Sequence, residues 1–547
     1  MKFFSASVFL FLSFCCFASG GEKVFRRPLE RVASMDPIRS AAIYSSHAIS
    51  LVYEPILEVD YYKRPYALRP GLCELPEVSE DALSYTFRIV PGSRFHPDPC
   101  FGPEGAKKGR PVTADDIVYS LSRLADKSNA SSGMWIMSAV ESMKAVDEKT
   151  VRIKLSRRLH VFPWMMALAY TGVVPREAVE KYGAKFGTLA VGSGPYRLES
   201  WRRNHEMTFA RFPEWRGWSA GVADSFDAKM NPVKGTPYGK IKYLVIDDVS
   251  TQWLMFLSGG VDFLSSVPRD NWDAVIGKDG KLLPSLEKDG VRLHEHPTLS
   301  VFYLGMNMRD PLLGKNVKLR QTLNCAFDFK SWSAFFNDRI LYSDGPLPDG
   351  VAGKVKTPFK YSHNLEKAKK LLAEAGYPGG IDPATGRRLE IPLAIGRATQ
   401  DAREQAELLQ AFYEKAGIKI EPSYMTWEAY LKAVNEGRVS IFLMGWAGDY
   451  PDAENFMQLF YSKNTAPGPN RCCYSNPVFD RIYEKAMSEV SEEKRNLYWI
   501  EAQEIVREEC PWVFLHVQKT CSLTREGMEG YKAGDFPYGS EKHFRAR

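Results

Sequence analysis

The amino-acid sequence predicts an α/β fold with mixed sheets and at least two lobes. Segments in which apolar and polar residues alternate, as in half-buried strands, are interspersed with amphipathic helical segments along the whole chain. The chain has 547 residues, which by length alone corresponds to about three or four domains. We find no internal repeat and no low-complexity tract in the sequence.

The first half contains two strand patterns with a capped helix between them. Tyr85–Val90 and Val151–Leu155 alternate apolar and polar residues. Thr113 is a suitable N-cap for a helix, and Asp115 and Asp116 suit its positive N-terminal end. Ile117, Leu121 and Leu124 then lie on one face of the predicted helix.

The second half contains three helix patterns, each with a start or stop signal. Asn364 is an N-capping residue, and Gly376 ends the helix that it begins. Another helix is predicted from Ser491 to about Glu509, where it stops before Pro511. A third helix is predicted from Thr399 to Ala416. Two strands are predicted, at 418–420 and 441–444. Three long loops rich in Gly, Pro and Asp are predicted to be surface connections: Pro97–Arg110, Asp344–Pro358 and Gly379–Arg388.

The N-terminus has the pattern of a secretory signal peptide over residues 1–20. A charged Lys2 precedes a short apolar stretch from Phe3 to Phe17, and small residues follow at a plausible cleavage site near Gly20. No later segment is apolar enough to span a bilayer, so the mature chain is predicted to be soluble. Cys15 and Cys16 leave a lipid anchor open as the alternative to free release.

Composition and motifs argue against several classes of function. The net charge of +6 is small and the basic residues are scattered, so a nucleic-acid groove is not indicated. The chain contains no Gly-x-Ser-x-Gly elbow, no His-Glu-x-x-His motif and no phosphate-binding loop. An enzyme is therefore not predicted, although residues distant in sequence can also converge on a catalytic site.

Histidines and cysteines do not form a recognisable metal site. His294-Glu295-His296 would place both histidines on one face of a strand, and we expect a structural role there. No cofactor is predicted. Seven cysteines remain after the signal peptide; in an exported protein Cys73–Cys100, and one of Cys472 and Cys473, are candidates for disulfides.

The segment Gly445–Phe456 is the most informative part of the chain. It follows the predicted strand 441–444 and presents Asp449 beside Trp446 in a Gly-rich turn. Glycines at a strand end let a second backbone approach closely. A carboxylate in a partly dry cleft suits a cation such as the α-ammonium group of a peptide; the alternative is an acidic turn of purely structural role.

Eight segments along the chain, taken together and in order, resemble one family. They are Ser34–Pro37, Tyr53–Leu57, Ser84–Val90 with Gly92–His96, Arg110–Ser120, Gly192–Leu198, Leu257–Asp262, Leu319–Asp328 and Ala368–Tyr377. On these motifs the chain resembles the family 5 extracellular solute-binding proteins of bacterial ABC importers, which include oligopeptide- and dipeptide-binding proteins. Two departures are an insertion at Cys100–Lys108 and Met35 in place of the usual Leu.

The resemblance implies a periplasmic-binding-protein-like fold of type II, with two lobes, a hinge and an additional subdomain. The expected boundaries are 24–56, 190–285 and 500–547 for lobe I, 57–189 for the subdomain and 286–499 for lobe II. It also implies a monomeric periplasmic protein that captures extended di- to oligopeptides between the lobes and delivers them to an ABC permease and its ATPase. A nickel chelate, haem or a sugar on the same fold is the alternative ligand.

The resemblance also implies a set of ligand-binding residues. Asp449 would pair with the ligand ammonium, and Gly445–Gly448, including Ala447, would add the peptide as a strand. Ala33 and Ser34 would face it from the other lobe. Arg397 would bind the ligand carboxylate with its guanidinium fork. Trp446 would pack on the ligand; its alternative is a place in the core.

Overall fold

The computed structural model of the protein describes residues 22–40, 42–227, 229–277, 279–536 and 538–547. Helices pack on mixed sheets throughout, which confirms the predicted α/β class. The predicted signal peptide, with Cys15 and Cys16, lies outside these residues. Within them, no helix combines the length and the apolar character needed to cross a membrane.

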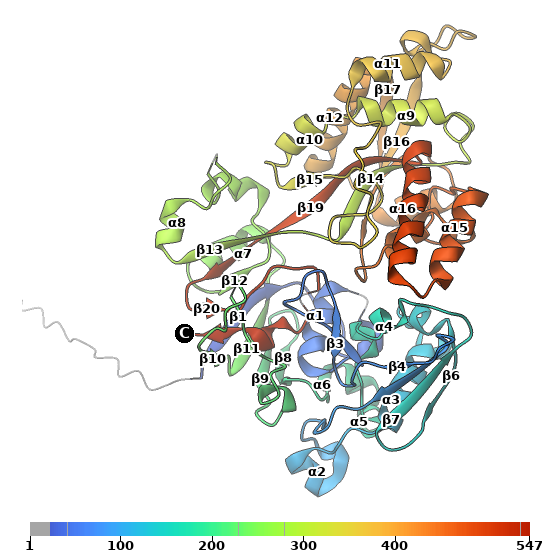
Figure 1. Ribbon diagram of the computed structural model, residues 1–547. Coiled ribbons are helices and arrows are strands. Elements are labelled where there is room, and N and C mark those ends of the chain that lie inside the picture. Colours follow the sequence, from blue (N-terminus) through green and yellow to red (C-terminus); the bar gives the residue numbers. More distant parts are fainter. Residues whose placement is uncertain (1–21, 41, 228, 278, 537) are drawn as a thin grey trace, which may run out of the picture.

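An eight-stranded sheet forms the upper part of the molecule in Figure 1. Its order is β12-β19-β14-β18-β16-β17, and β13 and β15 also pair with β19. The strands are β12 (Phe263–Leu264), β13 (Val291–Pro297), β14 (Ser300–Met306), β15 (Ile340–Tyr342), β16 (Glu390–Ile395), β17 (Lys419–Tyr424), β18 (Ile441–Ala447) and β19 (Trp512–Arg525). The helices of this part are α9 (Val317–Ala326), α10 (Phe329–Phe335), α11 (Leu365–Glu374), α12 (Gln400–Ala416), α13 (Trp427–Asn435), α14 (Glu454–Met457), α15 (Pro477–Ser488) and α16 (Glu492–Glu509).

A second group of elements lies below and contains the C-terminus (Figure 1). Its main sheet has the order β1-β11-β9-β8, and a small sheet has the order β10-β21-β20. The strands are β1 (Val24–Leu29), β8 (Tyr196–Arg202), β9 (Glu206–Arg211), β10 (Thr236–Pro237), β11 (Lys240–Val245), β20 (Met528–Glu529) and β21 (Arg545–Ala546). The helices are α1 (Ile43–Val52), α5 (Arg176–Tyr182) and α6 (Phe186–Leu189). Two further helices, α7 (Val249–Leu257) and α8 (Pro284–Lys288), pack against β12 and β13 of the large sheet.

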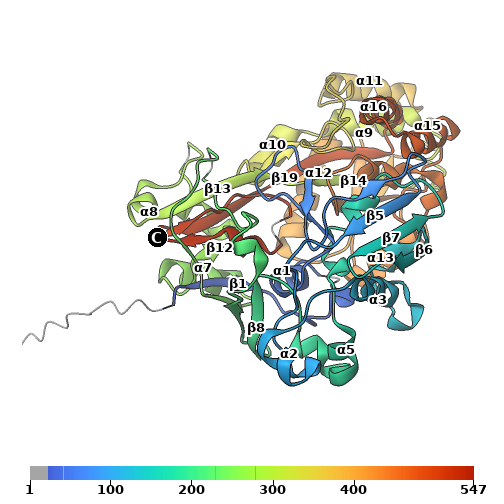
Figure 2. The same cartoon turned by 60° about the horizontal axis from the view of Figure 1, so that its bottom comes forward.

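A third group has its own sheet and its own apolar core. The sheet order is β4-β5-β7-β6, and a separate β2-β3 pair lies next to it in the chain. The elements are β2 (Leu57–Val59), β3 (Leu68–Pro70), β4 (Glu77–Val78), β5 (Ser84–Arg88), β6 (Val140–Ala145), β7 (Thr150–Leu155), α2 (Gly102–Lys108), α3 (Ala114–Ala125) and α4 (Phe162–Met165). In both views these strands lie at the opposite end from β13 and α8 (Figures 1 and 2).

The sequence patterns locate most of these elements. The side chain of Asp116 accepts hydrogen bonds from the backbone N–H and the hydroxyl of Thr113, as in a capping box. Asn364 accepts a hydrogen bond from a backbone N–H in the first turn of its helix, as predicted. Thr399 and Ser491 cap the two other predicted helices in the same way. Two expectations were wrong: the loop 97–110 contains helix α2, and β18 extends through Ala447 instead of ending before the glycines.

The long strand β19 pairs with different strands along its length. Its first half pairs with β14 and β15, and its second half pairs with β13 and β12. The predicted boundary at residue 500 falls inside α16, which contributes Trp499 and Val506 to the core of the large sheet. The division into lobes and subdomain at the stated residues stays a prediction.

All seven cysteines of the described residues are free thiols, so the expected disulfides were wrong. Cys73 is fully buried in the core of the third group, whereas Cys100 lies in the short 3-10 turn Pro99–Phe101 before α2 and packs against the core of the second group. The two residues that were expected to form a disulfide therefore pack in different apolar clusters. Cys472 and Cys473 are both buried.

Candidate functional site

Over part of its length, strand β18 has a neighbouring strand on one side only. On one side β18 pairs with β14 along its whole length, but on the other side β16 pairs only with Ile441 and Phe442. The N–H of Gly448 donates to the carbonyl of Leu299 at 2.7 Å. Because antiparallel strands bond at alternate residues, the backbone groups of Gly445 and Ala447 point away from β14, to the open edge.

A cavity of about 860 Å³, the main cavity, lies along this open edge. Its size is in the range of small-molecule sites, roughly 300–1,000 Å³. Its lining includes Leu443–Gly448 and residues from other parts of the chain, among them Ile43; Thr298–Ser300 with Phe302; Phe336; Gly396, Arg397 and Trp427; and His516, Asp535 and Tyr538. The main cavity therefore lies between the large sheet and segments of the second group.

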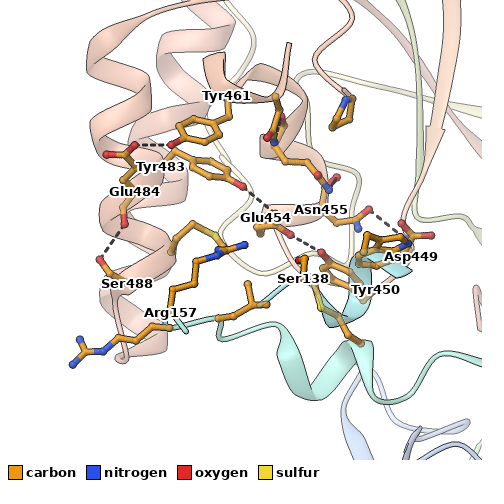
Figure 3. A pocket seen from close by; sticks show the side chains of 18 of the residues that line it. Ser138, Arg157, Asp449, Tyr450, Glu454, Asn455, Tyr461, Tyr483, Glu484 and Ser488 are labelled. Atoms are coloured by element: carbon orange, nitrogen blue, oxygen red, sulfur yellow. Dashed lines mark hydrogen bonds between the residues drawn. The ribbon is translucent and has the colours of Figure 1, made fainter. Parts of the chain in front are cut away.

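Trp446 separates the main cavity from a second hollow of about 910 Å³. The second hollow lies between the third group, which contributes Trp135 and Arg157, and the large-sheet group, which contributes Asp449, Glu454 and Tyr483. Figure 3 shows Asp449 at one end of this hollow and Glu484 and Ser488 at the other. The predicted site residues Gly445, Trp446, Ala447, Gly448 and Asp449 thus form one continuous wall.

Asp449 is a carboxylate without a cationic partner in the described part of the chain. Its side chain is open to the hollow, and no Lys, Arg or His of the described residues forms an ion pair with it. The surrounding protein still removes water, and this dehydration raises the pKa of Asp449 above its ordinary value, while the nearby Asn455 lowers it. A cation supplied by a ligand would relieve that cost.

Asn455 holds this wall in place. Its side-chain oxygen accepts hydrogen bonds from the indole N–H of Trp446 at 3.0 Å and from the backbone N–H of Asp449 at 3.2 Å. The residue is buried, and its amide nitrogen has no partner among the described residues. Figure 3 shows Asn455 beside Asp449. One side chain therefore fixes both the ring and the turn that carries the carboxylate.

Glycine is required at position 445 for a packing reason. A Cβ atom there would lie 2.7 Å from the ring of Phe302, which is closer than real Cβ contacts. Phe302 lies opposite Gly445 on β14 and lines the main cavity. The glycine therefore lets an aromatic ring lie flat against the strand at the cavity wall.

Glu454 is a second carboxylate of the hollow, with a different environment. It is buried and accepts hydrogen bonds from the hydroxyls of Tyr450 at 2.6 Å and Tyr483 at 2.9 Å (Figure 3). Burial raises the pKa of Glu454, and the two tyrosine hydroxyls oppose this. The protein itself satisfies this group.

Arg397 lines the main cavity, as its predicted role requires, but it already has partners. Its guanidinium lies 3.6 Å from the carboxylate of Asp401 and donates to the side-chain oxygen of Gln405 at 3.2 Å. Half of its side chain is exposed. A ligand carboxylate would have to share this cation with Asp401.

Ala33 and Ser34 do not line either cavity. Ala33 is exposed, and the hydroxyl of Ser34 accepts a hydrogen bond from the backbone N–H of Asp36. Asp36 in turn pairs with Arg123 at 2.7 Å. These contacts hold the turn before α1; a contact of the two residues with a ligand stays a prediction.

The His294-Glu295-His296 segment has the predicted strand structure, in β13. The Nε2 atom of His294 lies 2.9 Å from the hydroxyl of Thr524, and that of His296 lies 2.8 Å from the carboxylate of Asp535. No group of three or more His, Cys, Asp or Glu side chains in the described part of the chain is arranged to hold a metal ion.

Sequence reasoning missed most residues of the main cavity, among them three polar residues near the C-terminus. His516 lies in β19, and Asp535 and Tyr538 follow β20. The pKa of Tyr538 is raised to about 12 by burial and by the charges of Asp449 and Asp535. The one signal available was the isolated histidine within the apolar run of β19, since a buried polar residue in such a run needs a reason.

Residues 67–468 match the model of the family "Bacterial extracellular solute-binding proteins, family 5 Middle". The chain belongs to this family. The match spans most of the chain and includes β18, Arg397 and Asp449. The predicted resemblance is therefore confirmed, and the members of this family are solute-binding proteins.

The names of individual relatives refer to different ligands. The chain is 26% identical over 498 residues to "Heme-binding protein A" of Haemophilus influenzae, which covers 88% of this chain and 84% of the relative. It is 25% identical over 482 residues to "Dipeptide-binding protein" of Escherichia coli, with 84% and 83% covered.

A solved structure shows the same fold. HbpA2 from Haemophilus parasuis superimposes with a TM-score of 0.80 at 23% identity, over 96% of this chain and all of that chain. At this identity the likeness concerns the fold alone. It confirms the predicted periplasmic-binding-protein-like architecture.

Proposed function

We propose that this solute-binding protein captures peptides in extended form. The observation that carries the proposal is the pairing of an open strand edge with a carboxylate that lacks a cation. The backbone of Gly445 and Ala447 would hydrogen-bond to the peptide as an added strand, which gives affinity without sequence preference. Asp449, at the end of this edge, would bind the α-ammonium group.

We expect the two hollows to accommodate peptide side chains of different sizes. The main cavity and the second hollow meet at Trp446 and together border both sides of the wall that carries the edge. Trp446 would pack on the ligand between them. A micromolar affinity corresponds to about −8 kcal/mol, which one ion pair and a short hydrogen-bonded ladder can supply.

We expect the peptide to be delivered to a membrane transporter, as in the ABC importers that this family serves. A signal peptide at residues 1–20 would direct the chain to the periplasm, freely or with a lipid anchor at Cys15 or Cys16. Closure of the lobes over the ligand would remove water and strengthen the ion pair. The closed monomer would then dock on a membrane permease driven by an ATPase, with no chemical step.

Haem is the second candidate ligand, because one relative is named for binding it. The test is calorimetry of the protein produced from Gly21, freed of carried-over ligand by partial unfolding and refolding. We expect di- to pentapeptides to bind and their N-acetylated counterparts to bind much more weakly. Absence of binding by both peptide sets, together with a haem absorption change at equal stoichiometry, would replace the peptide with haem.

A further inference from the structure

His516 occupies a defined aromatic setting in the wall of the main cavity. It lies in β19, and its ring stacks on Phe302 with centroids 4.6 Å apart and planes 5° apart. Phe336 packs against the ring at 5.2 Å. Phe302 and Phe336 also line the main cavity. The imidazole is therefore held between rings and has little freedom to turn.

One hydrogen bond sets the position of the imidazole proton. The indole N–H of Trp332 donates to Nδ1 of His516 at 3.2 Å. An indole nitrogen can only donate, so Nδ1 must carry a lone pair. In a neutral ring the proton then lies on Nε2.

The charge state of the ring agrees with this assignment. Burial lowers the pKa of His516 to about 3, because the apolar surroundings disfavour a charged ring. Protonation of both nitrogens would also place two N–H groups against each other at Trp332. The ring is therefore neutral when the protein works near neutral pH.

Nε2 faces no protein acceptor. Among the described residues, Nε2 has no hydrogen-bond partner. It is also not fully enclosed by protein atoms. Since the ring lines the main cavity, its N–H is open to whatever the cavity holds. A ligand oxygen in the cavity can accept a hydrogen bond from this N–H in place of water.

We propose that His516 is a preset hydrogen-bond donor that recognises an oxygen acceptor of the ligand, a carbonyl or a carboxylate oxygen. This inference rests on the proposed peptide function. It also argues against haem iron at this position, because iron binds the lone pair of a nitrogen. Nε2 would offer that lone pair only if the proton moved to Nδ1, against the indole N–H of Trp332.

The first test reads the proton position without any ligand. Long-range ¹H–¹⁵N spectra of the ¹⁵N-histidine-labelled protein should show His516, assigned by its loss in His516→Gln, as the neutral Nε2-protonated form. Trp332→Phe keeps an aromatic ring but removes the donor, so it should yield a mixture of tautomers. An Nδ1-protonated ring in the wild type would overturn the inference.

The second test measures the affinity for trialanine by calorimetry. His516→Phe keeps the stacking but removes the donor, and should weaken binding about 3- to 10-fold, the usual value of one hydrogen bond. His516→Gln can still accept from Trp332 and donate to the ligand, so it should retain most of the affinity. His294→Gln is the matched control, since His294 is engaged with Thr524 outside the cavity, and it should bind like the wild type.

The outcomes separate this inference from the proposed function. If the wild type binds no peptide, the proposed function fails, and with it the assignment of a peptide oxygen. If the wild type binds and His516→Phe binds equally well, only the inference about His516 fails. Repeating the series with C-terminally amidated trialanine identifies the oxygen: a smaller effect of His516→Phe indicates the carboxylate, and an unchanged effect indicates a backbone carbonyl.

Discussion

Asp449 and Glu454 are two carboxylates five residues apart that border the same hollow, yet they differ in how the protein treats them. Burial raises the pKa of each. Glu454 receives two tyrosine hydroxyls, whereas Asp449 has no cation from the described residues. The comparison suggests that a polar group satisfied by the protein serves the fold, and one left open serves the ligand.

The same contrast separates other groups of the main cavity. Arg397 is engaged by Asp401 and Gln405. The backbone of Gly445 and Ala447, and Nε2 of His516, face the cavity with no such engagement. Substitutions of satisfied groups should therefore change stability, and substitutions of open groups should change binding.

The largest expected effect on stability comes from Glu454→Ala. Both tyrosine hydroxyls would lose their acceptor in a buried site, at a cost of about 3 kcal/mol in the free energy of unfolding. Urea denaturation measures this change. Glu454→Gln keeps one acceptor and should cost under about 1 kcal/mol. If Glu454→Ala were as stable as the wild type, the hydrogen bonds of Glu454 would not stabilise the fold, and the contrast with Asp449 would fail.

The next effect is on binding, from Ala447→Pro. Proline removes an N–H at the open edge and adds bulk there, which should weaken peptide binding by about 1–2 kcal/mol. The melting temperature should change little, because this N–H points away from β14. Ala447→Ser keeps the N–H and serves as the control. Wild-type affinity of the proline variant would show that the edge is not used.

A smaller effect concerns pH. The native pKa of Asp449 is raised, so the ligand-free native state binds more protons than the unfolded state between the ordinary and the raised value. The free energy of unfolding therefore falls as pH rises through that window, and Asp449→Asn should lack this slope. Peptide affinity has the opposite sign, because it needs the ionised form and is lost as pH falls. Calorimetry and urea denaturation at several pH values test both signs.

The smallest effect is expected from Arg397→Ala. An exposed cation that is already shared contributes little, so peptide affinity should fall less than about threefold. A loss of tenfold or more would show that the ligand displaces Asp401, and that this satisfied group still serves binding.

Local signals in the sequence were sufficient to locate most helices and strands. They also located the part of the site formed by Gly445–Asp449. N-caps at Thr113 and Asn364 locate helices because capping is decided within one turn. The Gly-rich segment around Asp449 was recognised because strand, glycines and carboxylate are contiguous. His516 and Tyr538 were missed because only the pairing of β19 with β14 and the return of the C-terminal segment bring them to the cavity. The partners of Arg397 and Asn455 depend likewise on side-chain packing that no local pattern encodes.

The most direct test of the account is a double-mutant cycle between Asp449→Asn and N-acetylation of trialanine. Removing one member of a partly buried charge pair should cost about 2–4 kcal/mol, or roughly 30- to 1,000-fold in affinity. We expect the free peptide to lose this much on Asp449→Asn, while the acetylated peptide binds both proteins with equal weakness. Equal affinity of the wild type and Asp449→Asn for the free peptide would contradict the assignment of Asp449 to the ligand ammonium.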